Sequence, residues 1–114
     1  MAVPQMSRLV ALSAANVALT VPANTAGSYV LGPVAANGRL DAHYVGRSDT
    51  DLAGRLTQHV GKYAAFVFAT ASSPMAAFHQ ECELFHEYKP TDNRIHPDRP
   101  ANSQWKCPRC TQFG

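Results

Sequence analysis

An Asn-Gly pair between two strand-like runs is the feature that most constrains the fold of this chain. Ser28–Val34 and Leu40–Val45 are short and rich in apolar residues, and Asn37-Gly38 lies between them. Both turn residues accept the positive φ angles that a type I′ turn demands. We therefore predict a β-hairpin over Gly27–Gly46.

A helix and a buried strand are predicted after the hairpin. Between Ser48 and Gly61 the apolar residues recur every four positions, Ser48 or Asp49 can cap the helix, and glycine commonly ends one. Tyr63–Thr70 is a continuous apolar run that is too short for a helix of its own. Such a run favours a buried central strand.

A second helix is predicted from Ser73, an N-cap residue followed by proline at the first helical position. It should run to about Tyr88, because Pro90 cannot continue a helix. The order of hairpin, helix, strand and helix predicts a small α+β domain. Its sheet should be three-stranded, mainly antiparallel and flanked by helices.

The segments outside this core carry weaker patterns. Residues 7–21 alternate loosely and could add a strand or two, and Pro22–Ala26 is typical of a turn. Residues 94–114 are rich in proline with little periodicity, which indicates an extended tail. We therefore predict an N-terminal extension (1–26), a core domain (27–93) and a C-terminal tail (94–114).

Composition limits the function classes open to the chain. With 114 residues, 46% of them hydrophobic and 16% charged, it suits one packed domain. No apolar run approaches the roughly 18–20 residues that span a bilayer, and Met1–Val21 lacks the continuous apolar core of a signal peptide. We therefore expect a cytoplasmic protein without a membrane partner.

Glu81 occupies an unusual position in the second predicted helix. Its neighbours one turn away are Ala77, Phe78, Leu84 and Phe85, whereas His79, Glu83 and Glu87 fall on the polar face. A carboxylate within an apolar stripe needs a cationic partner, a metal ion or a cleft. The alternative is that Glu81 lies at the rim of a less buried helix.

The first predicted helix has a related feature. Arg55 and His59 are i, i+4 neighbours at the border of its apolar stripe. Two such side chains could line a phosphate-binding pocket, because a guanidinium makes bidentate contacts with phosphate oxygens. The alternative is an ordinary amphipathic border.

Six short segments complete a recognisable series along the chain. In order they are Gly27-Ser28-Tyr29, Tyr44-Val45-Gly46, Leu52–His59, Glu81, Tyr88-Lys89-Pro90 and Asn93. Together they resemble the signature of the GIY-YIG nuclease superfamily. The chain departs from that signature at Ser28, where an apolar residue is usual, and by one extra residue between Gly46 and Arg55.

The resemblance implies a metal-dependent endonuclease that hydrolyses phosphodiester bonds, DNA being favoured over RNA. Glu81 would hold one Mg²⁺ or Mn²⁺ ion, and Arg55 would stabilise charge on the phosphate. Tyr29 would act as or position the general base, with His59 as an alternative base. Tyr44 would orient water or the phosphate, and Asn93 would be a supporting hydrogen-bond donor.

Basic side chains outside this set could contact the nucleic-acid backbone. The net charge is only +2, but basic residues cluster, and three of them are assigned to nucleic-acid binding: Arg47, Lys62 and Lys89. A homodimer or a separate recognition protein could supply further contacts. The rival interpretations are a binding module that does not cut, and a structural protein in which Arg55 and Glu81 form a buried ion pair.

The tail contains a CxxC motif, Cys107-Pro108-Arg109-Cys110. Such a motif supplies half of a structural zinc site, and His86 and His96, or a second copy of the motif in a dimer, could supply the rest. The alternative is a tail with two free thiols that is held by packing of Trp105. Cys82 is expected to be a small core residue.

Overall fold

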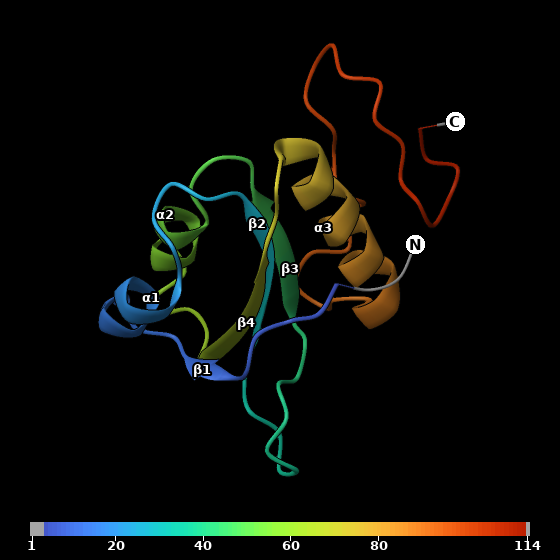
Figure 1. Cartoon of the computed structure of the whole chain (residues 1–114). Coiled ribbons are helices and arrows are strands. Elements are labelled where there is room, and N and C mark those ends of the chain that lie inside the picture. Colours follow the sequence, from blue (N-terminus) through green and yellow to red (C-terminus); the bar gives the residue numbers. More distant parts are fainter. Residues whose placement is uncertain (1–3, 114) are drawn as a thin grey trace.

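The computed structural model describes residues 4–113 as one antiparallel sheet with helices on both faces (Figure 1). The predicted α+β class is confirmed, with a fourth, two-residue strand added to the predicted sheet. The elements in chain order are β1 Val10–Ala11, α1 Ala14–Thr20, β2 Gly27–Gly32, β3 Tyr44–Ser48, α2 Leu52–Thr57, β4 Ala65–Thr70 and α3 Pro74–Tyr88.

The strand order in the sheet is β1-β4-β2-β3, and each neighbouring pair is antiparallel. One face is covered by α1 and α2, and the other by α3 (Figure 1). Because side chains alternate along a strand, β2 serves two cores. Tyr29 and Leu31 pack with Leu52 on the α2 face, and Val30 packs in a cluster with Leu84 on the α3 face.

The predicted hairpin is confirmed, but its turn is not of the expected type. β2 pairs with β3 from Gly27 opposite Ser48 to Leu31 opposite Tyr44. Of the two turn residues only Gly38 has a positive φ, at 82°, so a type I′ turn is excluded. The amide of Gly38 donates to Ala35 O at 2.9 Å, and the amide of Ala35 donates to Arg39 O at 2.8 Å, a pattern typical of three-residue hairpin loops.

The helix α1 was not predicted, since residues 7–21 suggested strands. Ser13 caps it by accepting a hydrogen bond from the amide of Asn16 at 3.1 Å. Val17 and Val21 are buried, whereas Leu19 is 82% exposed. The spacing Val17–Val21 fits i, i+4 on a helix as well as it fits alternation on a strand, which explains the error.

The helix α2 is shorter than predicted and has a different cap. Asp51 is its N-cap and accepts from the amide of Gly54 at 3.1 Å, whereas Ser48 accepts from the amide of Asp51 at 2.8 Å. Gly61, with φ of 89°, follows the helix in turn conformation. The predictions for β4 and for α3, which begins after the N-cap Ser73, are confirmed.

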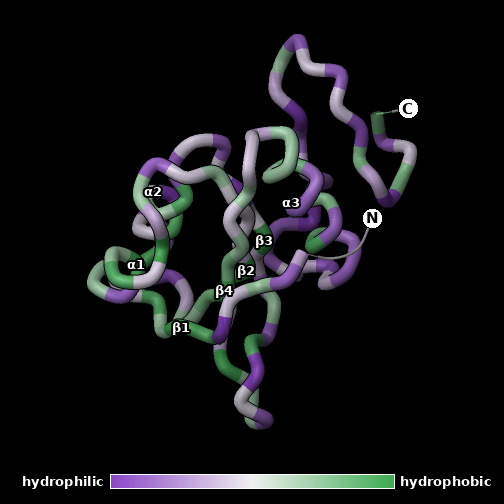
Figure 2. Tube along the Cα trace, in the orientation of Figure 1, coloured by the Kyte–Doolittle hydropathy of each residue, from purple (hydrophilic) through white to green (hydrophobic). Residues whose placement is uncertain are grey.

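The C-terminal segment has no helix or strand among the described residues 90–113, as predicted for a tail. It runs back along α3 and extends past the N-terminal end of that helix, and its trace is mostly hydrophilic (Figures 1 and 2). Trp105 and Phe113 nevertheless pack on Phe78 of α3, with ring centroids 5.8 and 5.9 Å from its own. No helix within residues 4–113 is long and apolar enough to cross a membrane.

Gly46 is required where Tyr29 crosses β3. The two residues are register partners, and the Tyr29 ring occupies the space of a side chain at position 46. A Cβ there would lie 2.5 Å from Cζ and Oη of Tyr29.

We predict that Gly46→Ala destabilises the protein by about 1–3 kcal/mol, because a methyl group must be forced against a fully buried ring. Urea unfolding followed by circular dichroism would measure the loss. In a Tyr29→Leu background the same substitution should cost distinctly less. An equal cost in both backgrounds would contradict the steric explanation.

Candidate functional site

A polar cleft of about 440 Å³ lies at the edge of the sheet, along β3. Its walls come from β2, β3, the loop after β3, α2, α3 and the C-terminal segment. Its polar lining includes the side chains of Tyr29, Tyr44, Arg47, Asp49, Arg55, Glu81 and Asp98.

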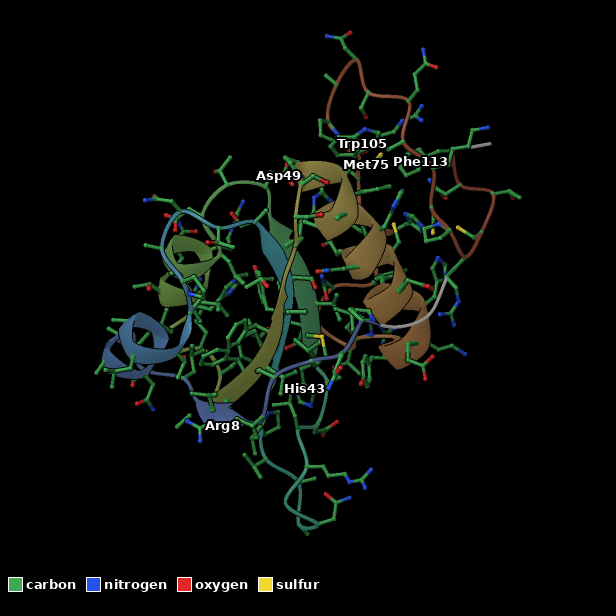
Figure 3. All side chains as sticks on the ribbon, in the orientation of Figure 1. Arg8, His43, Asp49, Met75, Trp105 and Phe113 are labelled. Atoms are coloured by element: carbon green, nitrogen blue, oxygen red, sulfur yellow. The ribbon has the colours of Figure 1, made fainter. Side chains whose placement is uncertain are left out.

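Alternation along the edge strand brings residues from both faces of the sheet to this cleft. Tyr44 packs with the α2 core, whereas Arg47 is directed to α3, where it meets Glu81. Because no strand follows β3 at this edge, groups from both faces can line the same hollow. Asp49, labelled in Figure 3 near the N-terminal end of α3, lies on the loop that closes one side.

Glu81 is buried on the cleft wall and has a cationic partner. Its side chain is 12% exposed, and its Oε1 accepts a hydrogen bond from Nη1 of Arg47 at 2.6 Å. Arg47 also donates through Nε to Asp49 Oδ1 at 3.0 Å, and its guanidinium lies 5.1 Å from the centre of the Phe78 ring. The apolar stripe thus contains an ion pair, and the partner is Arg47 rather than the Arg55 of the structural interpretation.

The ionisation of this pair follows from burial and mutual attraction. Burial raises the pKa of Glu81, and the guanidinium of Arg47 opposes that rise. Burial would lower the pKa of Arg47, but the carboxylates of Glu81 and Asp49 raise it overall. On the wall of the cleft, Arg47 therefore holds one oxygen of Glu81 against the effect of burial.

Arg55 differs from Arg47 in having an exposed guanidinium. It lines the cleft, and within residues 4–113 it makes no salt bridge. An arginine without a carboxylate partner keeps its full set of donors for an anion. Its position between α2 and the cleft therefore suits contact with a phosphate group.

Tyr29 and His59 form the second polar contact of the site. Tyr29 Oη lies 3.1 Å from Nε2 of His59, and the rings of Tyr29, Tyr44 and Tyr63 surround the imidazole. His59 Nδ1 is buried and has no partner among the described residues. Burial is the main cause that lowers the pKa of His59, and the positive charges of Lys62 and Arg55 lower it further.

Tyr29 and Tyr63 are held in their protonated form. Burial raises the pKa of Tyr29, with Tyr44 adding to the rise and Arg55 opposing it. Burial and the hydrogen bond that Tyr63 donates to Asp92 Oδ2, at 2.9 Å, raise the pKa of Tyr63 to about 12. Tyr29 is therefore a hydroxyl that shares a hydrogen bond with a neutral imidazole at neutral pH.

Four residues predicted for the nuclease site lie outside the cleft lining. One is His59, which contacts Tyr29 Oη; the others are Asn93, Lys62 and Lys89. Asn93 brackets β3 with two hydrogen bonds, accepting from the amide of Val45 at 3.1 Å and donating to Val45 O at 2.6 Å. Lys62 is exposed beyond α2, close enough to affect His59. Lys89 is exposed and forms the left-handed C-cap of α3, with φ of 47°.

The tail residues Cys107 and Cys110 meet the two histidines that the sequence suggested. Four possible ligand atoms lie within 4.8 Å of one another, one each from His86, His96, Cys107 and Cys110. This group, the His/Cys cluster, could bind a metal ion. Cys82 is buried beside it in the cluster of Phe78 and Cys107, as a core residue.

Sequence reasoning missed three features of this region. Glu83 was placed on the polar face of α3, but it is fully buried, because Arg109 of the tail covers it and donates to its Oε1 at 2.8 Å. The second feature is the position of Asp98 on the cleft wall. The third is the Arg47–Glu81 pair, whose two residues are far apart in the chain. No local pattern reports such contacts.

Comparisons of the chain with protein-family models, with characterised proteins and with solved structures found no match. The likeness to GIY-YIG nucleases therefore rests on the residues themselves.

We predict that the His59 ring titrates with a midpoint below 6.5, the ordinary value for histidine. Histidine ring NMR signals followed against pH would measure it. Lys62→Ala should raise the midpoint, because one repelling charge is removed. A midpoint at or above 6.5 in the parent protein would contradict the burial seen here.

The same shift makes folding depend on pH. Below pH 6.5 the unfolded chain binds a proton at His59 more readily than the native chain does. The contribution of His59 to the free energy of unfolding therefore decreases as pH falls through this range.

Proposed function

We propose that the protein is a metal-dependent endonuclease of the GIY-YIG type that hydrolyses phosphodiester bonds in DNA. The main observation that supports this proposal is that Tyr29, Tyr44, Arg55 and Glu81 line one cleft. These residues come from four different elements, and the resemblance assigns each of them to catalysis. A cleft with an acidic group, a free guanidinium and hydroxyl groups suits the reaction class.

Glu81 is compatible with a hard divalent cation. Only its Oε1 is hydrogen-bonded among the described residues, to Arg47, and the carboxylate lines the cleft. Mg²⁺ keeps several waters and needs few protein oxygens when a substrate phosphate completes its shell. When bound, Mg²⁺ or Mn²⁺ would polarise the phosphate and lower the pKa of a bound water.

The phosphate would be held chiefly by Arg55. Its exposed guanidinium can donate two parallel hydrogen bonds to phosphate oxygens, and these strengthen as negative charge develops. Arg47 is held by Glu81 and Asp49, so it contributes positive charge from a fixed position. Tyr44 offers a hydroxyl on the same wall to orient the water or the phosphate.

Tyr29 and His59 would form a short proton relay. The attacking water gives its proton to Tyr29 Oη, while the hydroxyl proton of Tyr29 passes to Nε2 of neutral His59. The water oxygen bonds to phosphorus, the bond from phosphorus to the leaving oxygen breaks, and the leaving oxygen takes a proton from solvent. The raised pKa of Tyr29 argues against a free tyrosinate, and a relay does not require one. Arg55 and Lys62 then favour proton release from His59.

The ion pair of Glu81 with Arg47 also favours a second candidate, a nucleic-acid-binding module that does not cut. At 2.6 Å the guanidinium neutralises the carboxylate that would attract a cation. In that case the free Arg55 would bind a phosphate without hydrolysis. The two candidates differ in whether Mg²⁺ or Mn²⁺ leads to product.

We predict that the purified protein cuts supercoiled plasmid or single-stranded DNA in the presence of Mg²⁺ or Mn²⁺. Glu81→Gln and Arg55→Ala should each lower the rate by about 10²-fold or more, the usual scale for losing a main electrostatic group. Gel electrophoresis over a time course would give the rates. RNA of the same length, run in parallel, tests the choice of DNA.

The matched controls are Glu87→Gln on the exposed side of α3 and Arg39→Ala in the hairpin loop, both of which should keep the parental rate. Circular dichroism shows whether each variant is folded. Unchanged cutting by folded Glu81→Gln would overturn the metal assignment. No cutting by the parent, together with DNA binding that Arg55→Ala weakens, would establish the non-cutting module instead.

A further inference from the structure

The His/Cys cluster joins the C-terminal segment to the last turn of α3. His86 lies on α3, and His96, Cys107 and Cys110 lie on the segment that follows it. Two thiols and two imidazoles are the donor set of a structural zinc site. In a tetrahedral site with bonds of about 2.0–2.3 Å, ligand atoms lie about 3.3–3.8 Å apart. Closing from 4.8 Å to that spacing needs only small side-chain movements.

The groups around these donors are arranged to support a metal. His96 Nδ1 lies 2.8 Å from Pro97 O, so its N–H is used there and Nε2 presents a lone pair beside Cys110 Sγ, 3.3 Å away. The backbone amide of Arg109 donates to Cys107 Sγ at 3.4 Å, which holds this sulfur in position beside the other donors. His86 Nε2 is buried without a partner among residues 4–113, and a metal–nitrogen bond would satisfy it.

We propose that His86, His96, Cys107 and Cys110 bind one Zn²⁺ ion, and that this ion fastens the C-terminal segment to α3. Zinc is favoured over Mg²⁺ or Ca²⁺ because thiolate and imidazole are soft or borderline ligands, whereas those ions take oxygen. Two thiolates balance the charge of the ion. All four donors belong to one chain, so a second copy is not required.

The ion would also act on the cleft through the segment that it holds. Asp98, two residues after His96, lines the cleft. Trp105, two residues before Cys107, packs on Phe78, whose ring lies against Arg47, the partner of Glu81. Figure 3 shows Trp105 and Phe113 together beside the start of α3. Without zinc the part of the segment that follows Asn93 is held to α3 chiefly by these rings and the Arg109–Glu83 pair.

Metal analysis of protein purified under reducing conditions is the first test. It should give about one zinc per chain, and Cys110→Ser and His86→Gln should each lose it. The matched controls Cys82→Ala and His79→Gln change the same residue types on α3 outside the His/Cys cluster and should keep it. Replacement by Co²⁺ should produce the absorption bands of a tetrahedral thiolate site in the parent and controls alone.

Limited trypsin digestion tests the fastening. EDTA treatment should speed cleavage after Arg94, Lys106 or Arg109 by about tenfold or more, because removal of the ion would loosen this segment. Adding Zn²⁺ should restore protection, whereas adding Mg²⁺ should not.

Two results would overturn the proposal. One is a folded parent protein that binds no zinc after reconstitution although both Cys107 and Cys110 are reduced. The other is equal zinc content in the parent, Cys110→Ser and His86→Gln proteins. Neither measurement depends on DNA cleavage, so failure of the nuclease proposal leaves this test intact.

Discussion

The cleft depends on the register between β2 and β3. Placing Tyr29 opposite Gly46 puts the tyrosine ring across β3, and the same register sends Arg47 to the other face, toward α3. A slip of one residue would exchange the two faces of the strand and separate these groups. Asn93 holds the strand by pairing with both backbone groups of Val45. The cleft therefore depends on the edge strand β3, which β2 holds on one side and Asn93 on the other.

Charge in the cleft is distributed unevenly, with consequences for chemistry. Arg47 is fixed by two carboxylates, while Arg55 is free to meet an anion from solvent. The neutral His59 and the protonated Tyr29 lie behind them, shielded by aromatic rings. The cleft thus combines the fixed charge of Arg47, the unpaired guanidinium of Arg55 and the neutral imidazole of His59. Such groups are suited to binding a phosphodiester and accepting a proton from its attacking water. The carboxylate of Glu81 connects this arrangement to α3.

The C-terminal segment, which has no regular secondary structure, is part of the same architecture. It buries Glu83 under Arg109, packs Trp105 on Phe78, and brings Asp98 to the cleft. A segment without a backbone hydrogen-bond ladder needs side-chain anchors to stay in place. The zinc ion that we propose for the His/Cys cluster would provide such an anchor at the point where the segment returns to α3.

Local patterns in the sequence determined the hairpin, β4, α3 and the anomaly at Glu81, because turn glycines, apolar runs and caps act over a few residues. They also indicated His86 and His96 as partners of the CxxC motif. They failed at α1, where i, i+4 spacing fits a helix and a strand equally, and at Glu83, which looked solvent-facing. Only the tertiary structure decided that Arg47, not Arg55, pairs with Glu81 and that Asp98 reaches the cleft. The ion pair joins residues 34 positions apart, and both features depend on how strands, helices and the C-terminal segment pack rather than on any local preference.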